Sequence, residues 1–109
     1  MPEDPDRLTA EERRHVPVLV LPEQVRAGRP FDLVVQVGVE PHPMTPTHHI
    51  DWIEVLLGDT CAFAVDLSEH VGYPVVRVPL RLASSAVLSV RSHCTLHDTW
   101  LTMRRIDVR

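Results

Sequence analysis

The feature that most constrains the fold is a series of short apolar segments that prolines and turn residues separate. Ten prolines stand against four glycines in 109 residues, which favours short strands and rigid turns over long helices. Seven segments have the length and composition of strands: 16–20, 31–40, 50–57, 61–66, 75–82, 86–92 and 99–108. Strands at this spacing predict an all-β domain, either an antiparallel β-sandwich or a small barrel.

The quality of the alternation differs between these segments. In residues 75–82, Arg77 and Arg81 alternate with apolar residues, so we expect both arginines on a solvated face. In residues 50–57, Asp51 and Glu54 make the alternation imperfect. Cys61 begins a compact apolar segment and is predicted to be a buried thiol.

Charge and hydropathy exclude several classes of partner. The formal net charge is -4 with neutral histidines, which gives no electrostatic basis for binding nucleic acid. No apolar run approaches the roughly 20 residues that span a bilayer, and the acidic start of the chain has no hydrophobic signal core. We therefore expect a cytoplasmic protein that binds neither nucleic acid nor membranes.

Residues 1–14 are predicted to form a mobile N-terminal arm, followed by one domain over residues 15–109. Thr9 and Glu12 have the spacing of a capping box, in which side chains and backbone satisfy each other's hydrogen bonds. This pair predicts one helical turn at the end of the arm. A charged, disordered tail is the alternative.

Histidines and one cysteine occur in three distant segments and indicate a metal site. His42 and His48 enclose two prolines that forbid a helix, so they belong to a shaped loop. Cys94 and His97 are separated by two residues, a spacing suited to chelation in a tight turn, and His15 precedes the first strand. Imidazole and thiolate are ligands of protein-bound iron, copper and zinc.

The number of candidate ligands favours iron. Structural zinc takes four ligands, and a blue-copper site takes two histidines, one cysteine and a weak axial ligand. Four imidazoles and one thiolate in a square pyramid leave one octahedral position open, as a redox iron needs for a small oxygen species. The remaining histidines, His49, His70 and His93, are interpreted as surface residues or neighbours of the site.

The same segments resemble the signatures of a known family. Arg-His-Val-Pro at 14–17, His-Pro-Met-Thr-Pro-Thr-His-His-Ile at 42–50 and Cys-x-x-His at 94–97 are similar to the three motifs of the superoxide reductases. This family includes neelaredoxin and the iron-binding domain of desulfoferrodoxin. The resemblance covers nearly all of the chain after residue 14, and Trp100 fits the family's aromatic residue after the last motif. No early Cys-x-x-Cys is present, so we expect the one-iron type.

The resemblance implies both a fold and an activity. The fold would be an immunoglobulin-like, seven-stranded antiparallel β-sandwich. A mononuclear non-haem iron, cycling between Fe²⁺ and Fe³⁺, would be held by four histidines in a plane and one axial cysteine: His15, His42, His48, His97 and Cys94. The reaction would be the one-electron reduction of superoxide to hydrogen peroxide, with rubredoxin or a similar protein as electron donor. We also expect a homo-oligomer, either a dimer or a tetramer.

The residues around the ligands depart from the family pattern. Where the family usually has Glu-Lys before His-Val-Pro, this chain has Arg13 and Arg14. Arg14 is our candidate catalytic residue because it keeps the positive charge that attracts an anion, although a guanidinium is a poor proton donor. Arg13 replaces a glutamate that can cap the oxidised iron, and Glu11 or Glu12 is a candidate to substitute for it.

The last motif also differs, because Thr95 and Asp98 replace the usual Asn and Gly. These changes are expected to alter the turn and the hydrogen bonds that tune the sulfur. Asp98 adds a negative charge that disfavours an anionic substrate. One alternative is therefore an iron-binding or electron-transfer module without reductase activity. Another is a metal-free sandwich that binds a partner chain, as sulfur-oxidation carrier proteins of similar fold do, but the intact ligand set argues against it.

Overall fold

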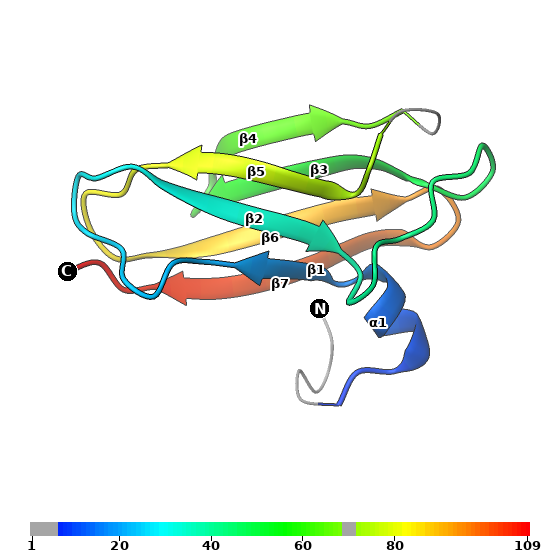
Figure 1. Cartoon of the computed structure of the whole chain (residues 1–109), viewed down its shortest axis with the longest axis horizontal. Coiled ribbons are helices and arrows are strands. Elements are labelled where there is room, and N and C mark those ends of the chain that lie inside the picture. Colours follow the sequence, from blue (N-terminus) through cyan, green and yellow to red (C-terminus); the bar gives the residue numbers. More distant parts are fainter. Residues whose placement is uncertain (1–6, 69–71) are drawn as a thin grey trace.

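The structure, a computed structural model, describes residues 7–68 and 72–109. His70 and the first six residues of the predicted arm lie outside this range. One helix and seven strands follow in the order α1 (Ala10–His15), β1 (Pro17–Val20), β2 (Phe31–Val37), β3 (Ile50–Leu57), β4 (Thr60–Asp66), β5 (Val75–Leu80), β6 (Ala86–Cys94) and β7 (Asp98–Ile106) (Figure 1). In the described part of the chain, no helix is both long enough and apolar enough to cross a membrane.

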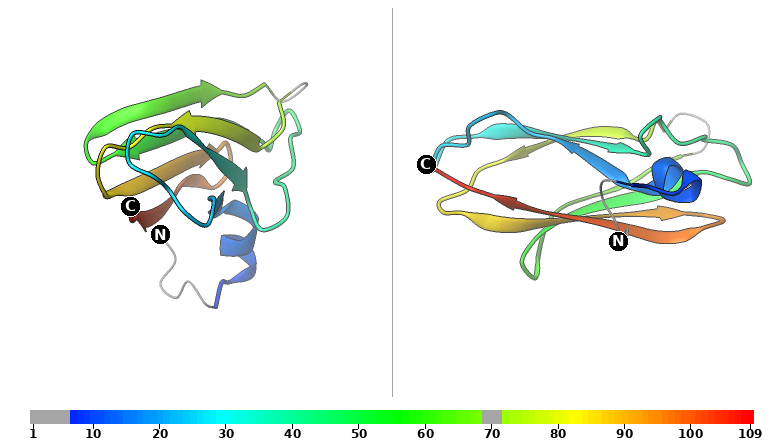
Figure 2. Two further views of the ribbon diagram at one scale, coloured as in Figure 1. Left: turned by 60° about the vertical axis from the view of Figure 1, so that its left-hand side comes forward. Right: turned by 90° about the horizontal axis from the view of Figure 1, so that it is seen from below.

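The strands form two antiparallel sheets that face each other. One sheet has the order β1-β2-β5 and the other the order β4-β3-β6-β7. The right-hand view of Figure 2 shows the two layers edge-on, with α1 at one end of them. The prediction of a seven-stranded, immunoglobulin-like antiparallel sandwich is confirmed.

The core lies between the layers and follows from the alternation in the sequence. Val35 of β2 and Val90 of β6 are fully buried, and each belongs to a strand in which every second residue points inward. Val55 of β3 is also fully buried and alternates with Ile53. Arg77 and Arg81 are exposed, as predicted. The sheets are also joined directly, because Thr102 Oγ1 in β7 donates a hydrogen bond to Pro17 O in β1 at 2.6 Å.

Two β-bulges explain where the alternation fails. Asp51 is an extra residue between the pairs Ile50–Cys94 and Trp52–His93, so Ile50 and Ile53 both point inward although they are three residues apart. A second bulge lies in β4, where Phe63 pairs with Val55 but Cys61 pairs with Leu56. Because of this shift, Cys61 does not point inward as Phe63 does. Cys61 is therefore exposed, and the prediction of a buried thiol is wrong.

Helix α1 begins at the predicted capping box. Thr9 Oγ1 accepts a hydrogen bond from Glu12 N at 3.1 Å, and Glu12 Oε1 accepts one from Thr9 N at 2.8 Å. These bonds satisfy backbone donors that a short helix would otherwise expose. The helix ends at His15, whose side chain is only 1% exposed. Whether the residues before it form a mobile arm stays a prediction.

The turn after β2 holds α1 against the sandwich. The predicted strand over residues 31–40 stops at Val37, because Gly38 has a φ of 87°. Gly38 N donates to Val16 O at 2.9 Å, and Val39 N donates to Arg13 O at 2.7 Å. A Cβ atom at Gly38 would lie 2.6 Å from Arg14 O and closer still to Glu40 O. Only glycine allows this approach of the two backbones.

We expect Gly38→Ala to lower the free energy of unfolding by roughly 2–4 kcal/mol, from a left-handed backbone and a steric collision. Gly28→Ala is the matched control, because Gly28 has a φ of 74° but an added Cβ would have no neighbour within 4 Å. The control should lose only about 1–2 kcal/mol. Urea denaturation of both metal-free variants measures the difference. Equal losses would show that the contact between the Gly38 turn and α1 contributes nothing.

Candidate metal centre

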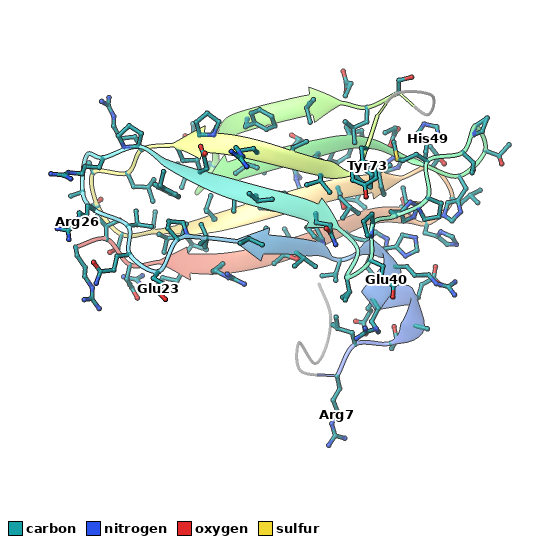
Figure 3. All side chains as sticks on the ribbon, viewed as in Figure 1. Arg7, Glu23, Arg26, Glu40, His49 and Tyr73 are labelled. Atoms are coloured by element: carbon teal, nitrogen blue, oxygen red, sulfur yellow. The ribbon has the colours of Figure 1, made fainter. Side chains whose placement is uncertain are left out.

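Three segments that are distant in sequence meet at the end of the sandwich that carries α1. His15 comes from the last turn of α1, His42 and His48 from the loop between β2 and β3, and Cys94 and His97 from the end of β6 and the turn into β7. Glu40 and His49 lie at this same end, whereas Glu23 and Arg26 lie at the other (Figure 3). The fold thus brings all five predicted ligands together.

Four of the five form a compact group. His15, His42, His48 and Cys94 each offer a donor atom, and these atoms all lie within 4.8 Å of one another. His42 Nε2 is 3.5 Å from Cys94 Sγ. Two ligands of one ion, each about 2.0–2.3 Å from it, are separated by at most about 4.6 Å. The spacing is therefore close to that of a shared ion.

His97 completes the cluster from the β6–β7 turn. Its Nδ1 lies 3.0 Å from His15 Nε2 and 3.6 Å from Cys94 Sγ. The His97 side chain is 38% exposed, whereas His15, His42 and Cys94 are buried. The cluster therefore has a closed side toward the core and an open side at His97.

Backbone carbonyls fix the orientation of two imidazoles. His15 Nδ1 donates to Glu11 O at 2.7 Å, and His42 Nδ1 donates to Pro43 O at 2.8 Å. Each bond leaves the Nε2 lone pair directed at the cluster, the usual arrangement of metal-binding histidines. Trp100 also packs on His15, with ring centroids 4.9 Å apart and planes 14° apart, and its Nε1 donates to His97 O.

Burial favours the neutral, metal-binding form of His42 and His48. The pKa of His42 is lowered to about 4, chiefly by burial; the nearby His15, His48 and His97 act in the same direction, against a hydrogen bond to Pro43 that raises the pKa. Burial also lowers the pKa of His48, as do His97 and His15. An imidazole must be deprotonated at the nitrogen that binds a metal.

The donor set fits a redox iron. Within the described residues, His48 Nε2 is buried and has no hydrogen-bond partner, which is costly for a polar atom unless a ligand occupies the site. Four imidazoles and one thiolate exceed the four ligands of structural zinc and of blue copper. The cluster can therefore hold the mononuclear non-haem iron that the sequence predicts.

Comparison with known proteins supports the same interpretation. The family model described as Desulfoferrodoxin matches residues 7–103. The chain belongs to the desulfoferrodoxin family. A desulfoferrodoxin homologue of Methanothermobacter thermautotrophicus is 38% identical over 80% of this chain and 61% of its own length. The superoxide reductase of Pyrococcus horikoshii is 32% identical over 80% of this chain and 82% of its own.

Solved structures of superoxide reductases share the fold. A variant of the superoxide reductase (neelaredoxin) of Ignicoccus hospitalis superposes with a TM-score of 0.83 and 34% identity. The match covers 96% of this chain and 92% of that one. The likeness therefore extends over the whole sandwich and α1, beyond the three motifs that carry the resemblance in sequence.

The remaining histidines of the described chain lie outside the cluster. His49 Nδ1 donates to Thr45 O at 3.0 Å. His93 Nδ1 lies 2.6 Å from Asp51 Oδ1, and its ring stacks on Trp52. Both neighbour a candidate ligand in sequence, and in an extended chain such neighbours point to opposite sides.

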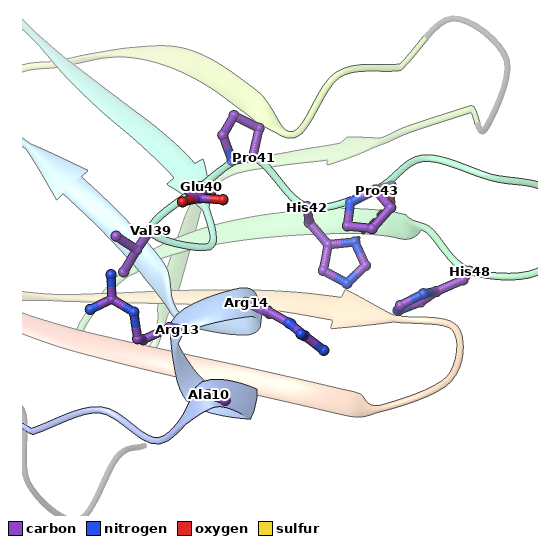
Figure 4. Close-up of a pocket in the computed structure, with 9 residues that line it drawn as sticks. All are labelled: Ala10, Arg13, Arg14, Val39, Glu40, Pro41, His42, Pro43 and His48. Carbon is purple, nitrogen blue, oxygen red and sulfur yellow. Dashed lines mark hydrogen bonds between the residues drawn. The ribbon is translucent and has the colours of Figure 1, made fainter.

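A pocket opens beside the cluster, between α1 and the β2–β3 loop. Arg14 extends from α1 toward the side that holds His42 and His48, whereas Arg13 extends toward Val39 and Glu40 (Figure 4). The charge of Arg14 contributes to the lowered pKa of His48. Of the two arginines that replace the family's Glu-Lys pair, Arg14 is therefore the one directed at the cluster.

The departures in the last motif leave the turn intact. Asp98 has a φ of 69°, a conformation that glycine adopts at lower cost but aspartate tolerates. Thr95 N donates to His49 O at 3.0 Å, and His49 N donates to Thr95 Oγ1 at 3.2 Å. These bonds tie the Cys94–His97 turn to the loop of His42 and His48, a role that the sequence did not predict.

Proposed function

We propose that this chain is a superoxide reductase that converts superoxide to hydrogen peroxide at an iron held by the cluster described above. The observation that carries the proposal is the convergence of the donor atoms of His15, His42, His48 and Cys94 within 4.8 Å, with His97 Nδ1 beside them. Membership of the desulfoferrodoxin family supports it.

The five residues would act together as the ligands of iron, four through imidazole nitrogen and Cys94 through sulfur. When bound, ferrous iron supplies the single electron that, with two protons, converts superoxide to hydrogen peroxide. The chain fixes the surroundings of that exchange. Cys94 is fully buried, so its sulfur is shielded from solvent on the core side. A pocket opens beside His42 and His48.

Arg14 would act on the substrate by electrostatic attraction. Its side chain is exposed at the pocket, where a permanent positive charge raises the local concentration of a small anion. A guanidinium does not deprotonate near neutral pH, so the protons of the product come from water and not from Arg14. Arg14 therefore guides the substrate.

A donor must return one electron to the site after each turnover, and we propose a rubredoxin-like protein for this role. The turn between Cys94 and His97 offers a contact point, because Leu96 is 61% exposed beside the partly exposed His97. We further propose that the protein works in the cytoplasm as a homo-oligomer, a dimer or a tetramer, as the family resemblance implies.

The visible spectrum tests the activity directly. Protein loaded anaerobically with Fe²⁺ should develop a thiolate-to-ferric absorption band after a superoxide pulse, with formation of about one hydrogen peroxide per iron. Oxidation without peroxide would favour the iron-binding or electron-transfer module. A protein that binds no iron would contradict the enzyme and leave only the shared fold.

Cys94→Ser should abolish the thiolate-to-ferric band, because the substitution removes the sulfur while keeping a side chain of similar size. The chain should stay folded, since the described core extends well beyond this residue. Circular dichroism checks folding, and the visible spectrum of the iron-loaded variant checks the band. Cys61→Ser is the matched control and should keep the band, because Cys61 is exposed at the start of β4. An unchanged spectrum in Cys94→Ser would rule out this sulfur as a ligand.

Arg14→Ala should slow the reaction with superoxide by roughly three- to tenfold at low ionic strength, with a smaller effect at high salt. Arg14→Lys should restore most of the rate. Arg13→Ala removes the same charge from the same helix but points toward Glu40 (Figure 4), so we expect a weaker effect. Pulse radiolysis at two salt concentrations measures these rates. If Arg14→Ala and Arg13→Ala behave alike, only the total charge matters and Arg14 has no specific role.

A further inference from the structure

Glu11 contacts the imidazole that completes the cluster. Its Oε1 lies 3.2 Å from His97 Nε2 and 3.6 Å from His15 Nδ1. The other ring nitrogen of His97, Nδ1, faces Cys94 Sγ at 3.6 Å. The carboxylate of Glu11 therefore meets His97 on the side of the ring that points away from the cluster.

We propose that Glu11 is a positioning residue that orients His97 and strengthens it as a metal ligand. A carboxylate next to the outer nitrogen of a ligating imidazole fixes the ring and raises its basicity. The inference rests on the proposed function only in that it requires a metal at the cluster. It gives Glu11 a different role from that of a capping ligand, because its carboxylate meets the His97 nitrogen that points away from Cys94. Glu11, His15 and His97 also form a second group of donor atoms within 4.8 Å of one another, and in this group we assign Glu11 to orienting His97.

His97 needs such support more than the other anchored histidines do. The Nδ1 atoms of His15 and His42 donate to the backbone carbonyls of Glu11 and Pro43, and both side chains are buried. His97 instead lies in a short turn with 38% of its side chain exposed, and the contact at its outer nitrogen is with the Glu11 side chain. An exposed imidazole loses rotational freedom when it binds a metal, and a pre-oriented ring reduces that cost.

The sequence of α1 leaves Glu11 free for this role. Glu12 is engaged in the capping box with Thr9, so the two adjacent glutamates have different partners. Glu11 lies one helical turn before His15, and its backbone carbonyl and its side chain both lie next to a cluster histidine. A single residue thereby links α1 to the β6–β7 turn.

The test compares Glu11→Gln and Glu11→Ala with Glu12→Gln as the matched control. Glu12→Gln removes the same charge from the same helix but keeps the capping box, because glutamine can serve at that position. Two quantities are measured on full-length protein: Zn²⁺ affinity by competition with a chelator, and the midpoint potential of the iron-loaded form. Neither measurement requires superoxide.

We expect Glu11→Ala to weaken Zn²⁺ binding roughly tenfold or more. Both Glu11 variants should raise the midpoint potential above that of wild type, because a nearby negative charge favours ferric over ferrous iron. Glu12→Gln should change either quantity much less. Circular dichroism of the metal-free forms checks folding, and Glu11→Gln, which keeps the size of the side chain, carries the test if Glu11→Ala does not fold.

The outcomes separate the two proposals. If the Glu11 variants match Glu12→Gln in Zn²⁺ affinity and midpoint potential while wild type reduces superoxide, the role of Glu11 is overturned and the proposed function stands. If wild type binds metal but does not reduce superoxide, a shift confined to the Glu11 variants still supports the positioning role. If wild type binds no metal, both proposals are overturned.

Discussion

The centre depends on the backbone contact that fastens a six-residue helix to the end of a β-sandwich. A helix of this length has little stability in isolation, so α1 needs tertiary contacts to hold His15 in place. Two hydrogen bonds supply them, from Gly38 N to Val16 O and from Val39 N to Arg13 O. The left-handed conformation of Gly38 ends β2 and lets the two backbones approach. The same turn leads into the loop of His42 and His48, so one junction positions ligands from both segments.

The cluster concentrates polar atoms where the sandwich would otherwise bury apolar ones. Burial of an imidazole nitrogen without a partner is unfavourable, and the lowered pKa values of His42 and His48 reflect the same desolvation. The unsatisfied His48 Nε2 shows that hydrogen bonds within the described chain do not meet the whole cost. A metal ion meets it by accepting the lone pairs that face the cluster. Binding therefore stabilises the folded chain as well as equipping it for chemistry.

Features that local sequence pattern determines could be predicted from the sequence, whereas features that depend on tertiary pairing could not. Each strand buries one face, so alternation predicted seven strands, and the proline-flanked histidines predicted a loop that brings ligands together. The prediction of a buried Cys61 is wrong because a bulge in β4 changes which way its side chain points, and a bulge depends on the partner strand. The contact of Glu11 with His97 was equally inaccessible, since it joins residues 86 positions apart. From the sequence, Glu11 is a candidate only for a replacement ligand, because the sequence alone does not show which ring nitrogen of His97 it faces.

The changes in this chain fall around the predicted ligands and leave the ligands themselves intact. Asp98 retains a left-handed conformation at a position where the family usually has glycine, so the turn survives with an added negative charge. Glu11 and Glu40 add further negative charge at the same end of the molecule (Figure 3). Arg13 extends toward Glu40, which offsets part of its field, whereas Arg14 extends toward His42 and His48. Under the proposed function, the attraction of an anion to this site would depend on the position of the Arg14 guanidinium more than on net charge. A charge at the mouth of a pocket acts over a shorter distance and with less screening than charges elsewhere on the surface.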